Sequence, residues 1–309
     1  MASHGLDLPN LGLRPDISTL LAALELFARR DGNDFEDEPE TEGQGDVLVD
    51  AAGAFHWLTM VVSSSLAWIE DSDAKEKIWA LAGARMAERC GRMAAPTKTR
   101  EIRIPSGSDD TEDLTISIVE PSLTSDSLGL KIWGSSYVLS KRLLREHHQQ
   151  HKMLHGQILE LGSGTGLFGI VAAKLGYKMY LTDLPEIVSN LQKNVDLNNQ
   201  PEASIEVLDW NDPESFALDG SKFDTVVVAD PIYSSEHPQL VANMVKRYLK
   251  PTPDSRLVVQ FPQRPKYQDL RDEFYNLLTQ QGLSSCLRET EAGRDEFGQM
   301  NYEFSLWKL

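Results

Sequence analysis

The chain has 309 residues, with 30 Lys or Arg against 47 Asp or Glu, so its formal net charge is −17. The hydrophobic fraction of 41% and the charged fraction of 25% are those of a globular protein and exclude a fibrous or globally disordered chain. The acidity argues against general nucleic-acid binding, because neutralising phosphates requires clustered basic side chains. The two cysteines, Cys90 and Cys286, provide neither a disulfide framework nor a cysteine-based zinc site.

The N-terminal part of the chain is predicted to be helical. DISTLLAALELFARR, residues 16–30, repeats its apolar residues at helical spacing, and two further helices are expected over residues 47–70 and 74–89. Residues 31–46 are acidic and almost free of apolar side chains, which predicts a mobile loop. We therefore expect an N-terminal helical module over residues 1–95.

One stretch needs a check for membrane insertion. Residues 51–69 carry no Asp, Glu, Lys or Arg, and a bilayer crossing takes about 20 apolar residues. The polar Ser63, Ser64 and Ser65 interrupt this stretch, so a buried helix is favoured over a membrane span. With no signal peptide visible either, we predict a cytoplasmic protein that does not associate with membranes.

The rest of the chain, residues 96–309, is predicted to be an α/β domain. It opens with two alternating runs, residues 100–104 and 114–120, that read as a β-hairpin, and a helix is expected over residues 134–146. Five β-rich runs then alternate with helical segments, which favours a parallel sheet covered on both faces. These runs are QILEL, KMYLT, SIEVL, FDTVVVA and RLVVQF. Two last runs, SSCLRET and NYEFSLWKL, flank a turn-like AGRDEFGQ and should pair antiparallel, giving seven strands.

The strongest motif is the glycine-rich segment ELGSGTG, which begins at Glu160. Gly162 permits a tight turn, Gly164 lets the backbone approach a ligand, and Gly166 eases the packing of the following helix. The helix N-terminus that follows can bind polar or anionic groups. Leu167 stands where a dinucleotide fingerprint needs Gly or Ala, and no lysine follows as in a phosphate loop. The loop therefore predicts a smaller ligand, an amino acid joined to a nucleoside.

Acidic and aromatic residues after the next two strands fit the same ligand. Asp183 ends a strand about 20 residues after Gly162, where an acid reaches ribose hydroxyls in open α/β sheets; its alternative role is to cap the next helix. Asp209 and Trp210 follow the third strand. Trp210 can cover an adenine face and Asp209 can accept from its amine, although the indole can equally pack on the sheet edge.

At this point the sequence resembles the class I, seven-β-strand S-adenosylmethionine-dependent methyltransferases. The segments ELGSGTG, TDLPE, LDW and ADPIY occur in the order typical of that fold. More narrowly, Trp133 ahead of the glycine loop and the Asp230-x-x-Tyr233 motif resemble the protein-lysine branch, methyltransferase family 16. AERCGRMAAPTKTR and EPSLTSDSLGLKIWGSSYVLSKRL resemble fungal enzymes that methylate translation elongation factors.

The resemblance implies a Rossmann-like sheet of order 3-2-1-4-5-7-6 with the last strand antiparallel. It also implies S-adenosylmethionine as the methyl donor, S-adenosylhomocysteine as the product, and a lysine of a protein, a translation elongation factor, as the acceptor. Together with the loop pattern it predicts these donor-binding residues: Trp133, Glu160, Gly162, Ser163, Gly164, Asp183, Leu184, Asp209, Trp210 and Ala229.

Asp230 and Tyr233 are the predicted catalytic residues. A lysine ammonium, with an ordinary pKa near 10.4, must lose a proton before it can attack. Asp230 can accept a hydrogen bond from the amine and direct its lone pair, and Tyr233 can supply a polar contact and an aromatic wall. Pro231 departs from the lysine-branch pattern and resembles the Asn/Asp-Pro-Pro-Tyr motif of enzymes acting on planar amines. A glutamine amide, a nucleobase or a small-molecule amine therefore stays an alternative acceptor.

Two other classes of function compete with a methyltransferase. One is a non-catalytic binding module that keeps the fold, and the other is a nicotinamide oxidoreductase, which Leu167 disfavours. Four histidines, His147, His148, His151 and His155, are predicted to lie on a surface helix rather than at a metal site. Glu236 and His237 could line the substrate entrance, but His237 is favoured as a loop or capping residue. We further predict a monomer whose N-terminal helices recognise the protein substrate.

Overall fold

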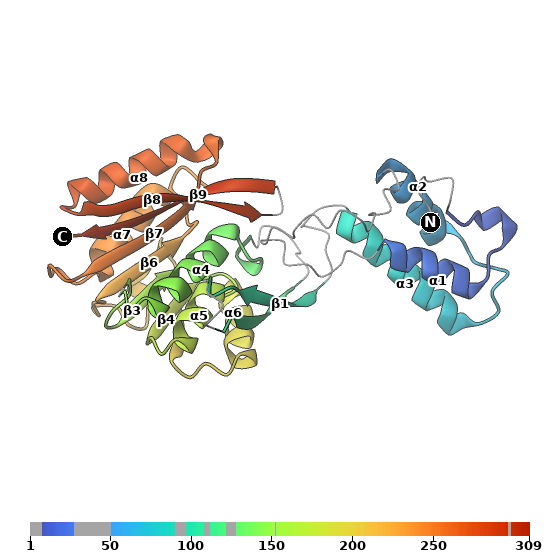
Figure 1. The fold of residues 1–309 in the computed structure, drawn as a ribbon, viewed down its shortest axis with the longest axis horizontal. Coiled ribbons are helices and arrows are strands. Elements are labelled where there is room, and N and C mark those ends of the chain that lie inside the picture. Colours follow the sequence, from blue (N-terminus) through green and yellow to red (C-terminus); the bar gives the residue numbers. More distant parts are fainter. Residues whose placement is uncertain are drawn as a thin grey trace. The chain divides into compact units, whose positions relative to one another are not determined.

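The structure is a computed structural model that describes residues 8–27, 51–89, 97–107, 112–121, 128–151, 153–295 and 298–309. Residue contacts divide the chain into two compact units, drawn in Figure 1. Of the described residues, the first unit holds the N-terminal helices and the second holds those from strand β1 (Lys98–Ile104) onward. The boundary predicted at residues 95 and 96 lies outside the described residues and stays a prediction, as does the acidic loop over residues 31–46.

In the described part of the first unit, three α-helices share an apolar core. A short 3₁₀ helix, η2 (Leu11–Leu13), precedes α1 (Ile17–Leu26), α2 (Ala51–Ser63) and α3 (Ser72–Arg89). Three tryptophans pack around this core, and each donates its indole N–H to a backbone carbonyl. The pairs are Trp57 with Pro9 at 2.8 Å, Trp68 with Pro15 at 2.9 Å, and Trp79 with Ser64 at 3.0 Å.

The second predicted helix is shorter than expected. Residues 47–50 lie outside the description, and α2 ends at Ser63 instead of continuing to residue 70. The chain turns there because Leu66 adopts a left-handed φ of 46° and donates its N–H to the Ser64 hydroxyl at 3.2 Å. Serine hydroxyls that bond to nearby backbone favour such turns over helix. Among the helices of the described ranges, none has both the length and the apolar character needed to cross a bilayer.

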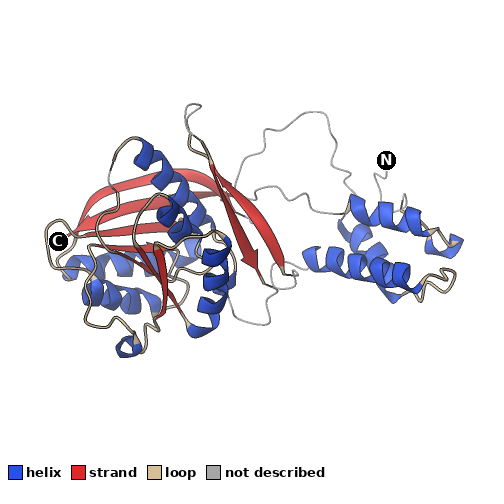
Figure 2. Cartoon of the chain, turned by 90° about the horizontal axis from the view of Figure 1, so that it is seen from below, coloured by secondary structure: helices blue, strands red, loops and turns tan. Residues whose placement is uncertain are grey.

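The second unit is built on a seven-stranded sheet of order β5-β4-β3-β6-β7-β9-β8 (Figure 2). When its strands are numbered 1 to 7 along the chain, they lie across the sheet in the order 3-2-1-4-5-7-6, as predicted. The last strand, β9, runs antiparallel to both of its neighbours. The strands are β3 (Ile158–Leu161), β4 (Met179–Asp183), β5 (Ala203–Val207), β6 (Thr225–Ala229), β7 (Arg256–Pro262), β8 (Ser284–Asp295) and β9 (Gly298–Lys308).

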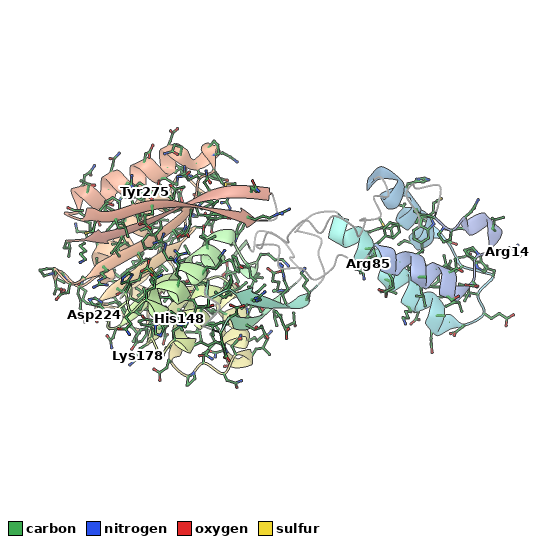
Figure 3. The ribbon with its side chains drawn as sticks, viewed as in Figure 1. Arg14, Arg85, His148, Lys178, Asp224 and Tyr275 are labelled. Atoms are coloured by element: carbon green, nitrogen blue, oxygen red, sulfur yellow. The ribbon has the colours of Figure 1, made fainter. Side chains whose placement is uncertain are left out.

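The last two strands are longer than the sequence predicts. The segment AGRDEFGQ was expected to be a turn, but the β8–β9 ladder continues through it as far as the pair Asp295 and Gly298. Cross-strand hydrogen bonds therefore outweigh the weak local strand preference of Gly and Asp here. Tyr275, labelled in Figure 3, also ties a covering helix to this ladder by donating its hydroxyl proton to Glu303 at 2.7 Å.

Helices cover both faces of the sheet and create two apolar cores. On one face α4 (Gly134–His148), α5 (Leu167–Lys174) and α6 (Pro185–Leu197) pack against residues such as Ile158 and Leu181. On the other face α7 (His237–Tyr248) and α8 (Gln268–Gln280) pack against residues such as Leu159 and Val228. Because successive strand residues point to opposite faces, the buried β3 contributes to both cores.

A two-stranded antiparallel hairpin, β1 (Lys98–Ile104) and β2 (Leu114–Glu120), joins this unit as predicted. It is attached through two asparagines spaced four apart, Asn194 on α6 and Asn198 at the C-cap of that helix. The Asn194 side chain accepts the Val119 N–H at 2.8 Å, and the Asn198 side chain accepts the Ser117 N–H at 3.1 Å. The side-chain amides of a helix thus satisfy backbone groups along one edge of β2. Short 3₁₀ turns complete the unit: η4 (Leu128–Leu130), η5 (Pro213–Ser215) and η6 (Pro265–Tyr267).

Candidate functional site

The glycine-rich segment forms a tight loop between β3 and α5. Gly162, Gly164 and Gly166 have φ values of 71°, 56° and 85°, a left-handed region that residues with a Cβ rarely adopt. The N–H groups of Gly162 and Ser163 both bond to the Thr182 carbonyl, at 3.0 and 2.9 Å. The loop is therefore fastened to β4 by its own backbone, and this fixes its course at the carboxyl edge of the sheet.

Neighbouring groups approach the loop so closely that side chains would not fit. A Cβ on Gly162 would lie 3.2 Å from the Trp210 ring, and one on Gly164 would lie 3.0 Å from the Gly129 carbonyl oxygen. A Cβ on Gly166 would come within 2.4 Å of Leu191. The bare backbone thus lies between an indole and the segment before α4, an arrangement that fits a nucleoside ligand bound against main-chain amides.

Asp183 joins β4 to the glycine loop. Its carboxylate accepts the Gly164 N–H at 2.7 Å through Oδ2 and the Leu184 N–H at 2.8 Å through Oδ1. Burial raises the pKa of Asp183 to about 6, although these two backbone hydrogen bonds lower it. The carboxylate therefore orders the loop and the residue that precedes α6. The N-cap of α6 is Leu184 and not Asp183, so the capping alternative is wrong. The ribose contact stays a prediction, for which each carboxylate oxygen keeps a lone pair.

Glu160 lies below the loop and is only 2% exposed. Burial raises its pKa to about 8, opposed by hydrogen bonding to the Ser163 side chain and the Gly169 amide, while the charge of Asp183 adds to the rise. Its backbone carbonyl accepts the Thr182 hydroxyl at 2.7 Å. Glu160 is therefore a buried support beneath the loop and carries a proton at neutral pH in the absence of a ligand.

The residues after β5 have different roles. Trp210 lies against the glycine loop and contacts His237 edge-on, with 5.8 Å between ring centroids. The Asp209 carboxylate instead closes its own turn, since Oδ1 accepts the Asn211 N–H at 2.8 Å and the Asn211 side-chain amide at 3.2 Å. The indole thus lies at the glycine loop, and its contact with an adenine stays a prediction, while one oxygen of Asp209 is already engaged.

Asp230 follows Ala229 at the carboxyl end of β6 and has a left-handed φ of 59°, unusual for a residue with a side chain. Its N–H donates to the Gln260 carbonyl on β7 at 2.9 Å, which continues the ladder past the end of β6. The side chain is 6% exposed and forms an ion pair with Arg264, whose Nη1 lies 3.0 Å from Oδ2 and 3.2 Å from Oδ1. Such conformations cost free energy and cluster at functional sites.

Tyr233 and His237 form an aromatic pair next to this carboxylate. Their rings meet edge to face with 4.2 Å between centroids, and the Tyr233 N–H donates to Nδ1 of His237 at 3.4 Å. Burial raises the pKa of Tyr233, as do the charges of Asp183 and Asp230, so the phenol stays protonated. Burial also lowers the pKa of His237, which keeps the imidazole neutral at pH 7.

Trp133 lies directly before α4 and contacts the ion pair through Arg264. It is the residue before the first turn of this helix, and the Arg264 guanidinium lies over its ring at 5.4 Å from the centroid. The preceding segment is held by Glu120, which accepts the Ile132 N–H at 2.8 Å. Trp133 is thereby linked through Arg264 to Asp230, which lies 97 positions later in the printed sequence.

Two residues of this site were missed or misjudged from the sequence. Arg264 carries no motif, and only the pairing of β6 with β7 brings it to Asp230. His237 was expected to be a loop or capping residue, but it is the first residue of α7 and its ring contacts both Trp210 and Tyr233. An aromatic residue four positions after Tyr233 was the available signal for His237.

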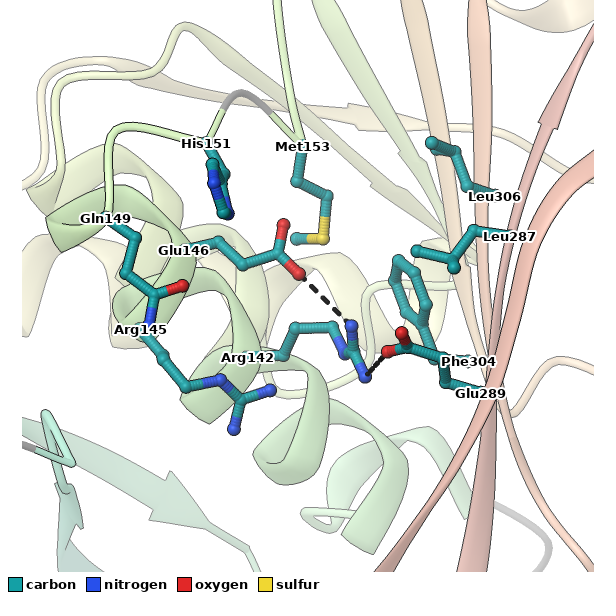
Figure 4. A pocket seen from close by; sticks show the side chains of 10 residues that line it. All are labelled: Arg142, Arg145, Glu146, Gln149, His151, Met153, Leu287, Glu289, Phe304 and Leu306. Atoms are coloured by element: carbon teal, nitrogen blue, oxygen red, sulfur yellow. Dashed lines mark hydrogen bonds and ion pairs between the residues drawn. The ribbon is translucent and has the colours of Figure 1, made fainter.

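A separate cavity of about 410 Å³ lies at the other edge of the sheet and contains none of the predicted site residues (Figure 4). Arg142 projects into it but is paired with Glu146, Glu289 and Glu291 at 2.7 to 3.1 Å and packs over Phe304. Its charge is thus satisfied within the protein. Among the described residues, no group of three or more His, Cys, Asp or Glu side chains is arranged to hold a metal ion.

A sheet of this order, with a glycine-rich turn after its first strand and an acid at the end of its second, defines the Rossmann-like class I methyltransferase fold. The family model described as "Lysine methyltransferase" matches residues 110–281. The chain therefore belongs to this lysine methyltransferase family, which confirms the family predicted from the sequence.

Curated relatives agree with this family. Protein-lysine N-methyltransferase EFM2 of Saccharomyces cerevisiae is 36% identical over 241 residues, a match covering 71% of this chain and 56% of that protein. Protein-lysine N-methyltransferase rrg1 of Schizosaccharomyces pombe is 31% identical over 267 residues, covering 82% and 84%. EEF1A lysine methyltransferase 3 of Xenopus tropicalis is 38% identical over 94 residues, covering 28% and 40%. Among solved structures, the glycopeptide N-methyltransferase MtfA aligns with a TM-score of 0.42 at 14% identity, covering 56% of this chain and 95% of that one.

Proposed function

We propose that this protein transfers a methyl group from S-adenosylmethionine to the side-chain amine of a lysine in a protein. The observation that carries the proposal is the Asp230 carboxylate, held at 6% exposure at the end of β6 beside the half-exposed Tyr233. Membership of the lysine methyltransferase family and the two yeast relatives support the acceptor class.

The donor would be held by the residues around the glycine loop. The bare glycine backbone of the loop lines one side, Asp183 offers its remaining lone pairs, and Trp210 covers the loop. Trp133, Ala229 and Glu160 border or support the same region, whereas Asp209 would contribute through its free oxygen. When bound, the sulfonium supplies an electrophilic methyl group, so the protein mainly has to provide alignment and proximity.

The acceptor side must deliver a neutral amine. Asp230 would accept a hydrogen bond from the amine and so direct the nitrogen lone pair, while Tyr233 supplies a face for the growing methylammonium. A buried amine next to positive charge has a lowered pKa, and water can carry its proton away. Asp230 is therefore proposed as the orienting acceptor and not as the final base.

We further propose a translation elongation factor as the substrate, in line with the printed name of the Xenopus relative and with the fungal resemblance of the sequence. The net charge of −17 would favour encounter with a basic partner.

We also propose that the enzyme is cytoplasmic and monomeric, and that it binds neither membranes nor, in general, nucleic acid. The helices before residue 97 would recognise the substrate, so deleting them should weaken protein methylation more than donor binding.

The test is to incubate the purified chain with radiolabelled S-adenosylmethionine and a cell lysate, and to identify the labelled protein and residue by mass spectrometry. Asp230→Asn is the matched variant of low activity, because Asn tolerates a left-handed φ as Asp does but cannot form the ion pair with Arg264 that orients the side chain. Gln192→Ala, on the exposed face of α6, is the control that should stay active. Label on glutamine, on nucleic acid or on small molecules would replace the lysine assignment, and no label would favour a non-catalytic module.

A further inference from the structure

Arg264 makes an ion pair that the methyl-transfer chemistry outlined above does not explain. Its Nη1 donates to Oδ1 of Asp230 at 3.2 Å and lies 3.0 Å from Oδ2, and the guanidinium lies over the Trp133 ring. The side chains of Asp230 and Arg264 are 6% and 20% exposed, so this pair is only weakly screened by solvent.

Hydrogen bonds to the backbone of the loop after β7 hold Arg264 in this position. Arg271 of α8 is 5% exposed, and its Nη1 donates to the Pro262 carbonyl at 2.7 Å and to the Arg264 carbonyl at 3.1 Å. The Arg264 N–H closes a turn on the Pro262 carbonyl at 2.9 Å. The loop after β7 is therefore built to present one particular guanidinium to the end of β6.

The charge balance at Asp230 affects the pKa of an acceptor amine bound beside it. Within the described part of the chain, Arg264 after β7 pairs with Asp230, and Tyr233 after β6 is acted on by the charges of Asp230 and of Asp183 at the end of β4. His237 at the start of α7 contacts Tyr233 and is acted on by the charge of Glu236. Tyr233 and His237 are neutral at pH 7, and Arg264 is the cation in direct contact with the carboxylate. An unpaired Asp230 would stabilise an incoming ammonium and raise the pKa of the acceptor amine, which would keep it protonated and unreactive.

We propose that Arg264 is a positioning residue of the acceptor site, whose guanidinium orients and neutralises the Asp230 carboxylate so that the amine meets a hydrogen-bond acceptor without net negative charge. This inference rests on the proposed function. Asp230 can then direct the lone pair of the amine without holding its proton, and the packing of Arg264 on Trp133 keeps the carboxylate in one orientation.

The first test needs no acceptor protein, because it compares a cationic with a neutral ligand. Calorimetry with S-adenosylmethionine and S-adenosylhomocysteine gives the ratio of their affinities for wild type, Arg264→Gln, Arg264→Lys and the control Arg145→Gln. Arg145 lies in the separate cavity and pairs with Glu291 at 3.7 Å. Removing the cation beside Asp230 should raise the preference for the sulfonium about threefold to tenfold, whereas Arg264→Lys and Arg145→Gln should leave it unchanged. Taking the ratio cancels losses of affinity that both ligands share.

The second test uses the protein that is labelled in the lysate. For Arg264→Gln, the acid limb of the kcat profile at saturating acceptor should move by about one pH unit to higher pH, because kcat reports the pKa of the bound amine, while Arg264→Lys should keep the wild-type midpoint with a lower kcat. An unchanged affinity ratio together with an unchanged midpoint in Arg264→Gln would overturn this role for Arg264, even if wild type methylates lysine. If wild type labels no protein, the proposed function fails, and the affinity ratio still decides whether Arg264 neutralises Asp230.

Discussion

The carboxylate of Asp183 accepts a hydrogen bond from the backbone N–H of Gly164 at 2.7 Å, so the end of β4 fixes the loop that follows β3. The same carboxylate accepts the Leu184 N–H through its other oxygen. One side chain thus shapes two walls of the proposed donor pocket. The acid at this position is therefore a determinant of loop geometry as well as a candidate ribose ligand.

The first prediction follows from this contact. Asp183→Ala should lower the affinity for S-adenosylhomocysteine more than tenfold and the free energy of unfolding by about 1–3 kcal/mol, because two backbone donors lose a charged acceptor. Asp183→Asn retains one acceptor oxygen and should lose less in both measurements. Calorimetry and urea denaturation measure the two effects, with Asp196→Ala on the exposed face of α6 as the control. Wild-type affinity in Asp183→Ala would show that the loop does not need this anchor.

The buried Glu160 gives a prediction about pH. Its folded-state pKa is raised to about 8 by burial, so the folded protein holds a proton that the unfolded chain releases from its ordinary pKa of 4.5 upward. The proton on Glu160 makes its full contribution to the free energy of unfolding below pH 4.5. This contribution is lost as the pH rises through 8, and the free energy of unfolding falls by no more than about 1.4 kcal/mol per pH unit. Glu160→Gln cannot ionise and should therefore gain stability relative to wild type between pH 5.5 and pH 8.5.

Urea denaturation of both proteins at these two pH values measures this difference directly. The raised pKa of Asp183 acts in the same direction but is common to wild type and variant, so it cancels. Parallel pH dependence of the two unfolding free energies would mean that Glu160 is ionised in the folded protein.

The sequence was informative where one local segment builds a feature. The glycine loop, Asp183 and Trp210 each stand directly after a predicted strand, and parallel strands bring their carboxyl ends to one edge. The predicted ends of strands β8 and β9 and of helix α2 were wrong. Cross-strand pairing extends the two strands, and a serine-stabilised turn ends α2 at Ser63. Arg264 could not be found, since its partner Asp230 is separated from it by α7 and β7.

His237 connects the two halves of the site and gives a third prediction. Its ring contacts Trp210 on the donor side and Tyr233 on the acceptor side. His237→Ala should reduce S-adenosylhomocysteine affinity about twofold to tenfold, because an aromatic contact contributes about 0.5–1.5 kcal/mol. His237→Phe keeps the ring and should restore donor affinity. Calorimetry at pH 7.5, where the imidazole is neutral, measures both variants, and equal losses in the two would refute a role based on ring packing.

The last prediction concerns Asn194, which links the hairpin to the glycine loop. Its Oδ1 accepts the Val119 N–H at 2.8 Å, and its Nδ2 donates to the Thr165 carbonyl at 2.9 Å, so one buried amide connects β2 with the loop. Asn194→Leu has a similar volume but leaves both backbone groups without this partner, at a cost of about 1–3 kcal/mol each. The free energy of unfolding should fall by about 2–6 kcal/mol. Gln192→Ala, an exposed amide on the same helix, should change it by less than about 0.5 kcal/mol. Because Thr165 belongs to the loop, donor affinity should fall together with stability in Asn194→Leu; a loss of stability with unchanged affinity would show that the hairpin and the donor pocket are independent.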